Sequence, residues 1–201
     1  MDQIFAIFRA GGWVMYPLLA LSVVSLALIV ERLIYWGRGA GGANRFALYL
    51  ADLQNGNLKA AMARSQEDRT PVGRLVRMLA SGGSSRPSEG VAFAAIETLR
   101  TPIERWSSLL GVIVAAAPLL GILGTVTGII ESFDLLGAAT TISDPTVVAG
   151  GIAEALYTTA FGLTIALVTV LPHAVFRANT ERTLSRLEAI AGALSNEGSV
   201  T

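Results

Sequence analysis

The sequence contains no cysteine, a single histidine (His173) and few charged residues, which make up 15% of its 201 positions. The absence of cysteine excludes disulfide bonds, thiolate metal sites and a thiol nucleophile. Soluble domains average about 25% charged residues, so the shortage of charge argues against an ordinary soluble domain. The sequence also lacks a paired nucleophile and base, a phosphate-binding loop and a metal-ligand cluster. It therefore predicts neither an enzyme nor a protein with a metal or another cofactor.

The charged residues are balanced in sign, 15 basic against 15 acidic, so nothing points to nucleic acid as a partner. They are unevenly distributed along the chain. Residues 10–30 and 106–130 contain no acidic or basic residue. Residues 145–176 contain one acid, Glu154, and one histidine, His173. Each stretch is long enough to cross a hydrocarbon layer of about 30 Å as a helix. Three membrane spans are predicted, in preference to a soluble protein with buried helices.

The basic residues predict how these spans are oriented. Ten of them lie between Arg38 and Arg105 and three lie at 177–186, whereas the connection 131–144 has none. Because basic residues near span ends stay on the cytoplasmic side, we expect a periplasmic N-terminus and a cytoplasmic C-terminus. The protein is thus expected to be a multi-pass protein of the bacterial inner membrane.

The predicted fold class is an all-α membrane protein whose three transmembrane helices carry long cytoplasmic helical extensions. Apolar residues at helical spacing from about residue 87 run into the second span, which predicts one long helix there. An apolar seam near the C-terminus is expected to pack within the same chain. The seam consists of Leu184, Leu187, Ile190 and Leu194. The predicted order is an N-terminus (1–11), first span (12–36), cytoplasmic helices (37–107), second span (108–132), periplasmic loop (133–147), third span (148–175) and cytoplasmic tail (176–201).

Glu154 is an acid inside an apolar span. A charged group at the centre of a membrane helix costs about 2.5 to 3.5 kcal/mol on insertion scales, so such a residue is by default a candidate functional site. Two other interpretations stay open: an acid that hydrogen-bonds a neighbouring helix, and an acid that lines a wet vestibule. Glu131 and His173 lie nearer span ends, where solvated or interfacial roles are the simpler interpretation.

Small residues recur at helical spacing in the second and third spans. Such stripes allow helices to approach closely in lipid. The glycines expected at this contact are Gly121, Gly124, Gly128, Gly151 and Gly162. Thr125 and Glu154 each lie about six residues from the expected outer end of their span, so we expect them at one depth. Three helices cannot enclose a pore, and a hydroxyl-lined path therefore requires a homo-oligomer.

Two strings within these spans resemble a known signature. Residues 117–128 read APLLGILGTVTG and residues 151–163 read GIAEALYTTAFGL. Together they resemble the MotA/TolQ/ExbB proton channel family, with the ExbB/TolQ branch as the nearest match. The segments GWVMYPLL at 12–19 and ERL at 31–33 are similar to the first helix of that branch.

The resemblance implies a pentamer whose second and third helices line a pore. It also implies a single-span partner of the ExbD or TolR type with an intramembrane aspartate, and a TonB-like or TolA-like protein that receives the work. The family's pore threonines fall on Thr125 and Thr159, and its acid falls on Glu154. Membrane lipids surround such an assembly.

Helical spacing and the resemblance disagree about one position. Thr158 lies one turn from Glu154 on the same face, whereas Thr159 is rotated about 140° from Glu154. We expect Thr159 to face the pore and Thr158 to lie nearer a subunit interface. The alternative functions are a stator subunit of the MotA type and a membrane scaffold that conducts nothing. The sequence does not separate ExbB-like from TolQ-like duties, or H⁺ from Na⁺.

Overall fold

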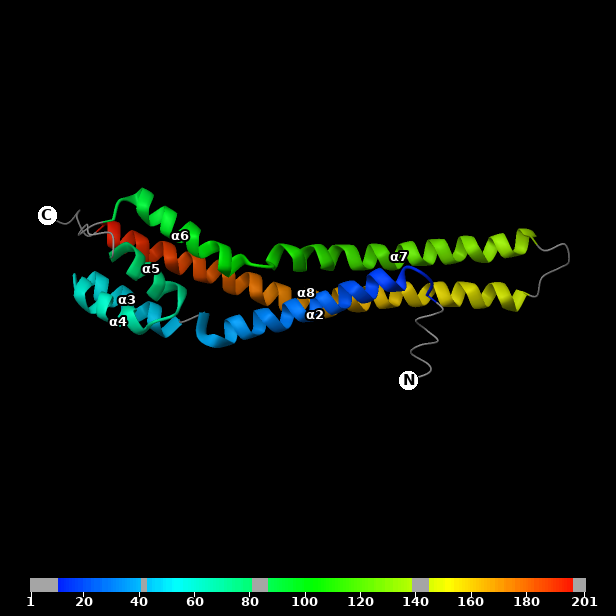
Figure 1. Ribbon diagram of the computed structural model, residues 1–201, viewed down its shortest axis with the longest axis horizontal. Helices are drawn as coiled ribbons and strands as arrows, with labels where there is room; N and C mark the ends of the chain where they lie inside the picture. Colours follow the sequence, from blue (N-terminus) through cyan, green and yellow to red (C-terminus); the bar gives the residue numbers. More distant parts are fainter. Residues whose placement is uncertain (1–10, 41–42, 81–86, 139–144, 197–201) are drawn as a thin grey trace. The chain divides into compact units, whose positions relative to one another are not determined.

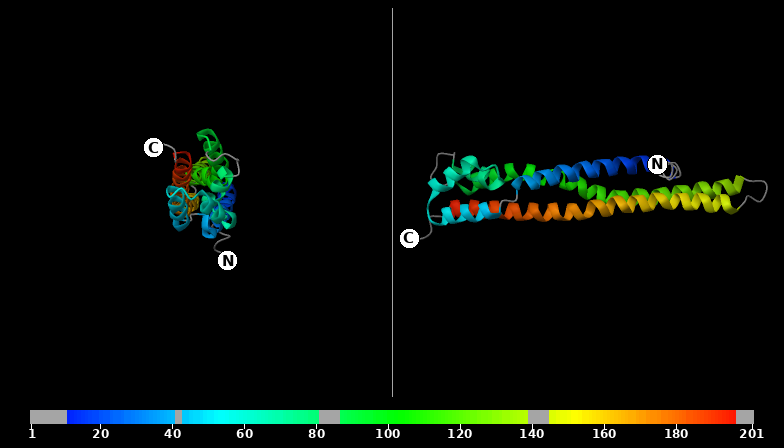
Figure 2. Two further views of the ribbon diagram at one scale, coloured as in Figure 1. Left: turned by 90° about the vertical axis from the view of Figure 1, so that its left-hand side faces the viewer. Right: turned by 90° about the horizontal axis from the view of Figure 1, so that it is seen from below.

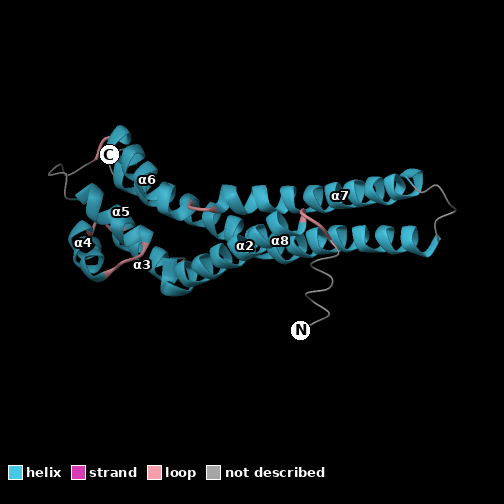
Figure 3. Cartoon of the chain, turned by 45° about the vertical axis from the view of Figure 1, so that its right-hand side comes forward, coloured by secondary structure: helices cyan, strands magenta, loops and turns pink. Residues whose placement is uncertain are grey.

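The computed structural model describes residues 11–40, 43–80, 87–138 and 145–196, and every regular element among them is helical (Figure 3). Figure 1 labels these helices along the chain, apart from the short π-helix η1. They are α2 (Met15–Tyr35), the π-helix η1 (Trp36–Ala40), α3 (Ala43–Gln54), α4 (Leu58–Glu67), α5 (Pro71–Ala80), α6 (Glu89–Glu104), α7 (Ser107–Ala138) and α8 (Pro145–Asn196). The predicted all-α class is confirmed.

The chain divides into two compact units. The span unit comprises Met1–Val30 and Trp106–Ala174, and the bundle unit comprises Glu31–Arg105 and Val175–Thr201. Helices α2 and α8 contribute residues to both, and each unit is described by itself below.

In the span unit, α7 and the first part of α8 run side by side in opposite directions, with α2 alongside (Figures 1 and 2). A small core joins the three helices. It consists of Val14, Met15, Leu18, Ile113, Ala117 and Ile165. Most of the remaining apolar side chains point outward, among them Leu119, Leu167 and Leu171, which are each at least 64% exposed. An apolar surface of this kind must be covered by lipid or by other membrane helices.

Three stretches of helix are long and apolar enough to cross a membrane: Met15–Arg38, Glu89–Asp134 and Ala149–Leu194. Between 22% and 28% of the most apolar window of each is buried inside the chain. Because so little of each window is buried, most of its apolar side chains face the surroundings of the helices and not the core of the chain. The prediction of three candidate spans is confirmed.

The bundle unit has a larger core, built from α3, α4, α5, α6 and the end of α8. Its central residues include Tyr49, Leu53, Leu75 and Ile103, all 2% exposed or less. Leu187, Ile190 and Leu194 are buried in this core and Leu184 packs against it, so the seam on α8 packs within the chain as predicted. Local sequence also sets the helix starts, because the side chains of Asn57 and Ser88 accept hydrogen bonds from the first turns of α4 and α6.

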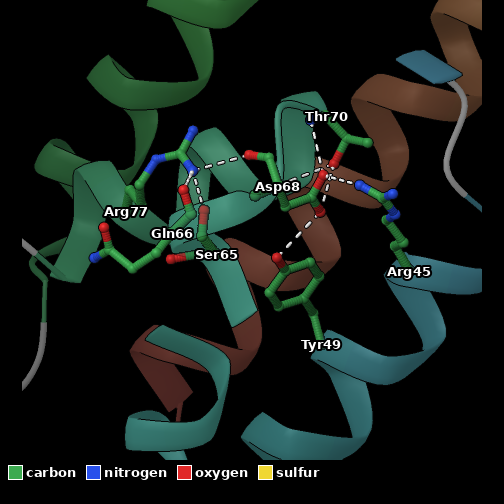
Figure 4. A network of polar contacts seen from close by, with 8 residues as sticks. Arg45, Tyr49, Ser65, Gln66, Asp68, Thr70 and Arg77 are labelled. Atoms are coloured by element: carbon green, nitrogen blue, oxygen red, sulfur yellow. Dashed lines mark hydrogen bonds and ion pairs between the residues drawn. The ribbon is translucent and has the colours of Figure 1, made fainter. Parts of the chain in front are cut away.

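Asp68 is a buried acid between α4 and α5 that ties three helices together (Figure 4). Arg45 on α3 donates to Oδ1 at 2.5 Å, and the Tyr49 hydroxyl donates to Oδ2 at 3.1 Å. The Thr70 amide and hydroxyl each donate at 2.9 Å. On the other side, Arg77 donates to the carbonyls of Ser65 and Asp68 at the end of α4. Each buried carboxylate oxygen is therefore satisfied, as burial of a charge requires.

This network shifts two pKa values in opposite directions. Burial acts to raise the pKa of Asp68, but the hydrogen bonds from Thr70, Arg45 and Tyr49 outweigh it and hold the pKa below its ordinary value. Burial, together with the neighbouring Asp68 carboxylate, raises the pKa of Tyr49 to about 12. Asp68 therefore adds stability above its unfolded-state pKa, and this is lost as the pH falls through the lowered folded-state pKa. Tyr49 adds stability below about pH 10, and this is lost as the pH rises through about 12.

We predict that Asp68→Asn lowers the free energy of unfolding by about 2 to 3 kcal/mol at neutral pH, because charge-assisted hydrogen bonds are lost in a buried site. The matched control is Asp52→Asn, whose ion pair with Arg64 at 3.1 Å is partly exposed. It should cost less than about 1 kcal/mol. Denaturant unfolding of the detergent-solubilised protein measures both, and the difference between wild type and Asp68→Asn should shrink below about pH 4. Equal costs for the two variants would contradict the assignment.

The expectation of one long helix through the second span is wrong. Helix α6 ends at Glu104, and Arg105 follows with an extended ψ of 132°. Trp106 then has a φ of 66°, the only positive φ of a non-glycine residue in the described ranges. Helix α7 starts afresh at Ser107, and Figure 3 draws the break as a short loop. Pro102 lies inside α6, before the break.

Candidate ion-pathway site

The contact between α7 and α8 is made by small residues, which allow the two backbones to touch. A Cβ placed on Gly121 would lie 2.9 Å from both the Thr158 carbonyl oxygen and the Thr159 Cα, and one on Gly128 would lie 2.6 Å from the Ala155 Cβ. Such distances leave no room for a side chain. Gly124 lies against the Thr158 side chain, Gly151 against Ser132, and Gly162 against the Ala117 carbonyl and Gly121. The structure thus places all five predicted glycines at this contact.

Thr158 lies at the centre of the contact. Its side chain is fully buried, and its hydroxyl is 3.0 Å from the Gly121 carbonyl and 2.7 Å from the Ala155 carbonyl. The expectation that Thr158 lies nearer a subunit interface is therefore wrong. The missing side chains at Gly121 and Gly124 make room for it between two helices of the same chain.

Thr159 and Thr125 lie together beside this contact. The Thr159 hydroxyl donates to the Gly121 carbonyl at 2.9 Å and lies 3.4 Å from the Thr125 hydroxyl oxygen. Both side chains are half-buried, so they are accessible from one flank of the hairpin. Thr125 donates to the Ile122 carbonyl of its own helix at 2.6 Å. A pair of hydroxyls that can both donate and accept is suited to passing a proton or solvating a cation.

Glu154 is exposed on the surface of α8. Because successive helical residues are rotated by about 100°, Glu154 lies to one side of the buried Ala155 and Thr158, and Thr159 lies to the other. Glu154 and Thr159 are therefore about 140° apart around α8, with the residues that pack against α7 between them. A carboxylate on an apolar outer surface requires a polar neighbour or water from outside this chain.

The expectation that Thr125 and Glu154 share one depth is also wrong. Thr125 pairs with Thr159, whereas Glu154 lies next to Ala155, which faces Gly128. Glu154 is thus about one helical turn nearer the connection between α7 and α8 than Thr125 is. The reason is that α7 continues to Ala138 and α8 begins at Pro145, beyond the span ends from which the depths were counted.

Two further polar residues stand out in the span unit. Ser25 on α2 and Thr169 on α8 are buried, and their hydroxyl oxygens lie 2.6 Å apart. Thr169 donates to the Ile165 carbonyl, so Ser25 is the donor of the pair. The sequence analysis did not predict this pair. The one indication in the sequence was that each of two apolar runs contains a hydroxyl residue, Ser25 or Thr169. The pair joins α2 to the helix that carries Glu154.

The other two ionisable candidates lie apart from the threonine pair. His173 is half-buried at a position facing Gly111 on α7, and Glu131 is exposed in the C-terminal part of α7. Among the described residues, no three His, Cys, Asp or Glu side chains gather into a set that could hold a metal ion. The chemistry available at the site is therefore that of one carboxyl group and several hydroxyls, which suits proton or monovalent-cation transfer.

Three apolar helices, a close small-residue hairpin, and an acid and hydroxyls on its flanks define a multi-pass membrane protein of the ion-channel class. The profile of the MotA/TolQ/ExbB proton channel family matches residues 61–189, and the chain belongs to this family. Its relatives place it on the ExbB branch.

Three of the similar proteins come from two bacteria. The chain is 33% identical over 172 residues to the putative biopolymer transport protein ExbB-like 3 of Synechocystis sp., covering 84% of this chain and 82% of that protein. It is 36% identical over 177 residues to the putative ExbB-like 1 protein of the same organism, covering 85% and 68%. It is also 33% identical over 194 residues to the biopolymer transport protein exbB1 of Vibrio cholerae, covering 94% and 85%. This family consists of channel and transport subunits, not enzymes.

Proposed function

We propose that this protein is the channel subunit of an inner-membrane complex that uses the proton motive force to drive transport or envelope work. The observation that carries the proposal is Glu154, a carboxyl group exposed on the outer surface of an apolar helical hairpin. Left in lipid, it would cost about 2.5 to 3.5 kcal/mol. A polar environment supplied by other copies of the chain and by a partner removes that cost.

The proposed assembly is a homo-oligomer, pentameric as in the family, in which α7 and α8 surround a partner of the ExbD or TolR type. Glu154, Thr125 and Thr159 face the ion path, and Thr158 supports it from inside the hairpin. The partner's intramembrane aspartate takes part in proton transfer, and a TonB-like or TolA-like protein receives the work. Moving one charge through 100 mV supplies about 2.3 kcal/mol, which is comparable with the energy of a few side-chain contacts.

The proposed topology has residues 1–11 and 133–147 in the periplasm, and 37–107 and 176–201 in the cytoplasm. The uneven distribution of Lys and Arg supports it. Accessibility of single introduced cysteines to a membrane-impermeant thiol reagent tests it without background, because the chain has no cysteine of its own.

Co-expression with a single-span protein of the ExbD or TolR type, which we expect a neighbouring gene to encode, tests the proposed function. We expect a complex that survives detergent extraction and gives potential-driven proton flux in proteoliposomes, whereas this chain alone gives little. A complex without flux would favour the scaffold alternative. Failure to form any complex would contradict the proposal.

We predict that Thr159→Val lowers the flux of this complex about fivefold, because the loss of one hydroxyl contact from the path is worth about 1 kcal/mol. The matched control is Thr164→Val on the same helix, since the exposed Thr164 hydroxyl donates only to the Ala160 carbonyl, at 2.8 Å. That variant should conduct normally. Equal loss in the two variants would show that any lost hydroxyl disturbs α8, and would remove Thr159 from the path.

A further inference from the structure

Arg32, near the end of α2, is 3% exposed, although it carries a full charge. Its guanidinium pairs with Glu31 through two contacts of 2.6 and 2.9 Å and lies 4.5 Å from the centre of the Tyr35 ring. A buried arginine is costly unless its donors are satisfied. Two of its hydrogen bonds reach carbonyls 70 and 71 residues further along the chain, at the end of α6.

Nη1 of Arg32 donates to the carbonyls of Pro102 and Ile103, at 3.3 and 3.2 Å. These carbonyls belong to the last turn of α6, which ends at Glu104. The last carbonyls of a helix have no partner within that helix and must find one elsewhere. Arg32 therefore caps α6 from another helix.

The same two carbonyls have a second possible use. In a continuous α-helix they would accept hydrogen bonds from the amides four residues later, those of Trp106 and Ser107. The turn at Arg105 and the left-handed φ of Trp106 take these amides out of the helical path. A left-handed conformation is unfavourable for a tryptophan, so a compensating contact must hold the break open.

We propose that Arg32 is a positioning residue that sets where α7 begins, by capping the carbonyls at the end of α6 and so stabilising the broken arrangement over a continuous helix. With Arg32 in place, α6 ends at Glu104 and α7 begins at Ser107. When Arg32 withdraws, the two helices join into one. This role goes beyond the proposed ion path and does not depend on it.

Amide hydrogen exchange of the full chain in nanodiscs tests the proposal. The first amides of α7, those of Ser107, Ser108 and Leu109, have no acceptor within α7, whose opening bond runs from the Leu110 amide to the Trp106 carbonyl. In Arg32→Met these amides gain helical acceptors, and we expect their exchange to slow about tenfold. Combining Arg32→Met with Trp106→Gly should restore fast exchange, because glycine accepts the left-handed conformation without strain.

Unchanged or faster exchange at Ser107 to Leu109, with protection intact in the rest of α7, would overturn the proposal. If Arg32→Met loses protection throughout α7, the variant Arg32→Lys decides the question. Lysine keeps a charge beside Glu31 but lacks the planar fork of donors that arginine brings to the carbonyls. Slower exchange at the same three amides supports the proposal in that variant, and exchange at the wild-type rate overturns it. Proton flux, measured separately, reports on the ion path and not on this helix break.

Discussion

Glu154→Gln should abolish potential-driven proton flux through the complex of this protein with its single-span partner. Glutamine keeps the size and hydrogen-bonding capacity of glutamate but cannot take up or release a proton, so it removes only the titrating function. Loss of a proton-transfer group typically costs 10² to 10⁴ in rate, and we expect a fall of at least about a hundredfold. Flux into proteoliposomes under an imposed potential, followed with a pH-sensitive dye, measures it.

The matched control for this variant is Glu188→Gln, which removes an exposed acid from the part of α8 that lies in the bundle unit. It should leave flux unchanged. Glu154→Asp, which keeps a titratable carboxyl group but shortens the side chain, should retain part of the flux. If Glu154→Gln conducts like wild type while the complex still forms, Glu154 is a structural acid and the ion-path proposal fails.

Gly121→Val is expected to be the most destabilising single substitution in the span unit. A new Cβ would meet the backbone of Thr158 and Thr159 at 2.9 Å, and backbone atoms of a packed helix cannot move aside as a flexible side chain can. Separating the helices would also break the hydrogen bonds from both threonine hydroxyls to the Gly121 carbonyl. Overpacking costs about 1 to 3 kcal/mol, and each lost interhelical bond about 0.6 kcal/mol more.

We therefore expect Gly121→Val to lose about 3 kcal/mol or more, measured by reversible unfolding in mixed detergent micelles. The matched control is Gly150→Val on α8, because a Cβ at Gly150 would meet nothing within 4 Å in this chain. Its stability should stay within about 0.5 kcal/mol of wild type. Comparable losses in the two variants would mean that valine is harmful at either position for reasons unrelated to the α7–α8 contact.

The apolar helices and the face on which α7 meets α8 could be predicted, because local sequence pattern determines both. Uncharged runs predict the apolar helices, and glycines at spacings of three and four residues predict the face on which α7 and α8 meet. The register of α7 against α8 could not be predicted, because it depends on where each helix ends, and α7 continues to Ala138. This is why Glu154 lies a turn away from the depth expected from Thr125.

The features that depend on distant contacts escaped prediction. Nothing near Arg105 and Trp106 in the sequence ends a helix, since the group that caps α6 is Arg32, far away along the chain. Similarly, Thr158 and Thr159 are adjacent and identical in type. Their different environments arise from the packing of α7 against them, with Gly124 making room for Thr158 and Thr125 meeting Thr159.

The Asp68 network has a consequence for how the bundle unit comes apart. One carboxylate accepts hydrogen bonds from α3 and from the segment that joins α4 to α5, and Arg77 on α5 holds the end of α4. None of these helices can detach without leaving buried polar atoms unpaired, and that cost couples their openings. Helices α3, α4 and α5 therefore form one foldon, which opens as a whole and not by fraying helix after helix.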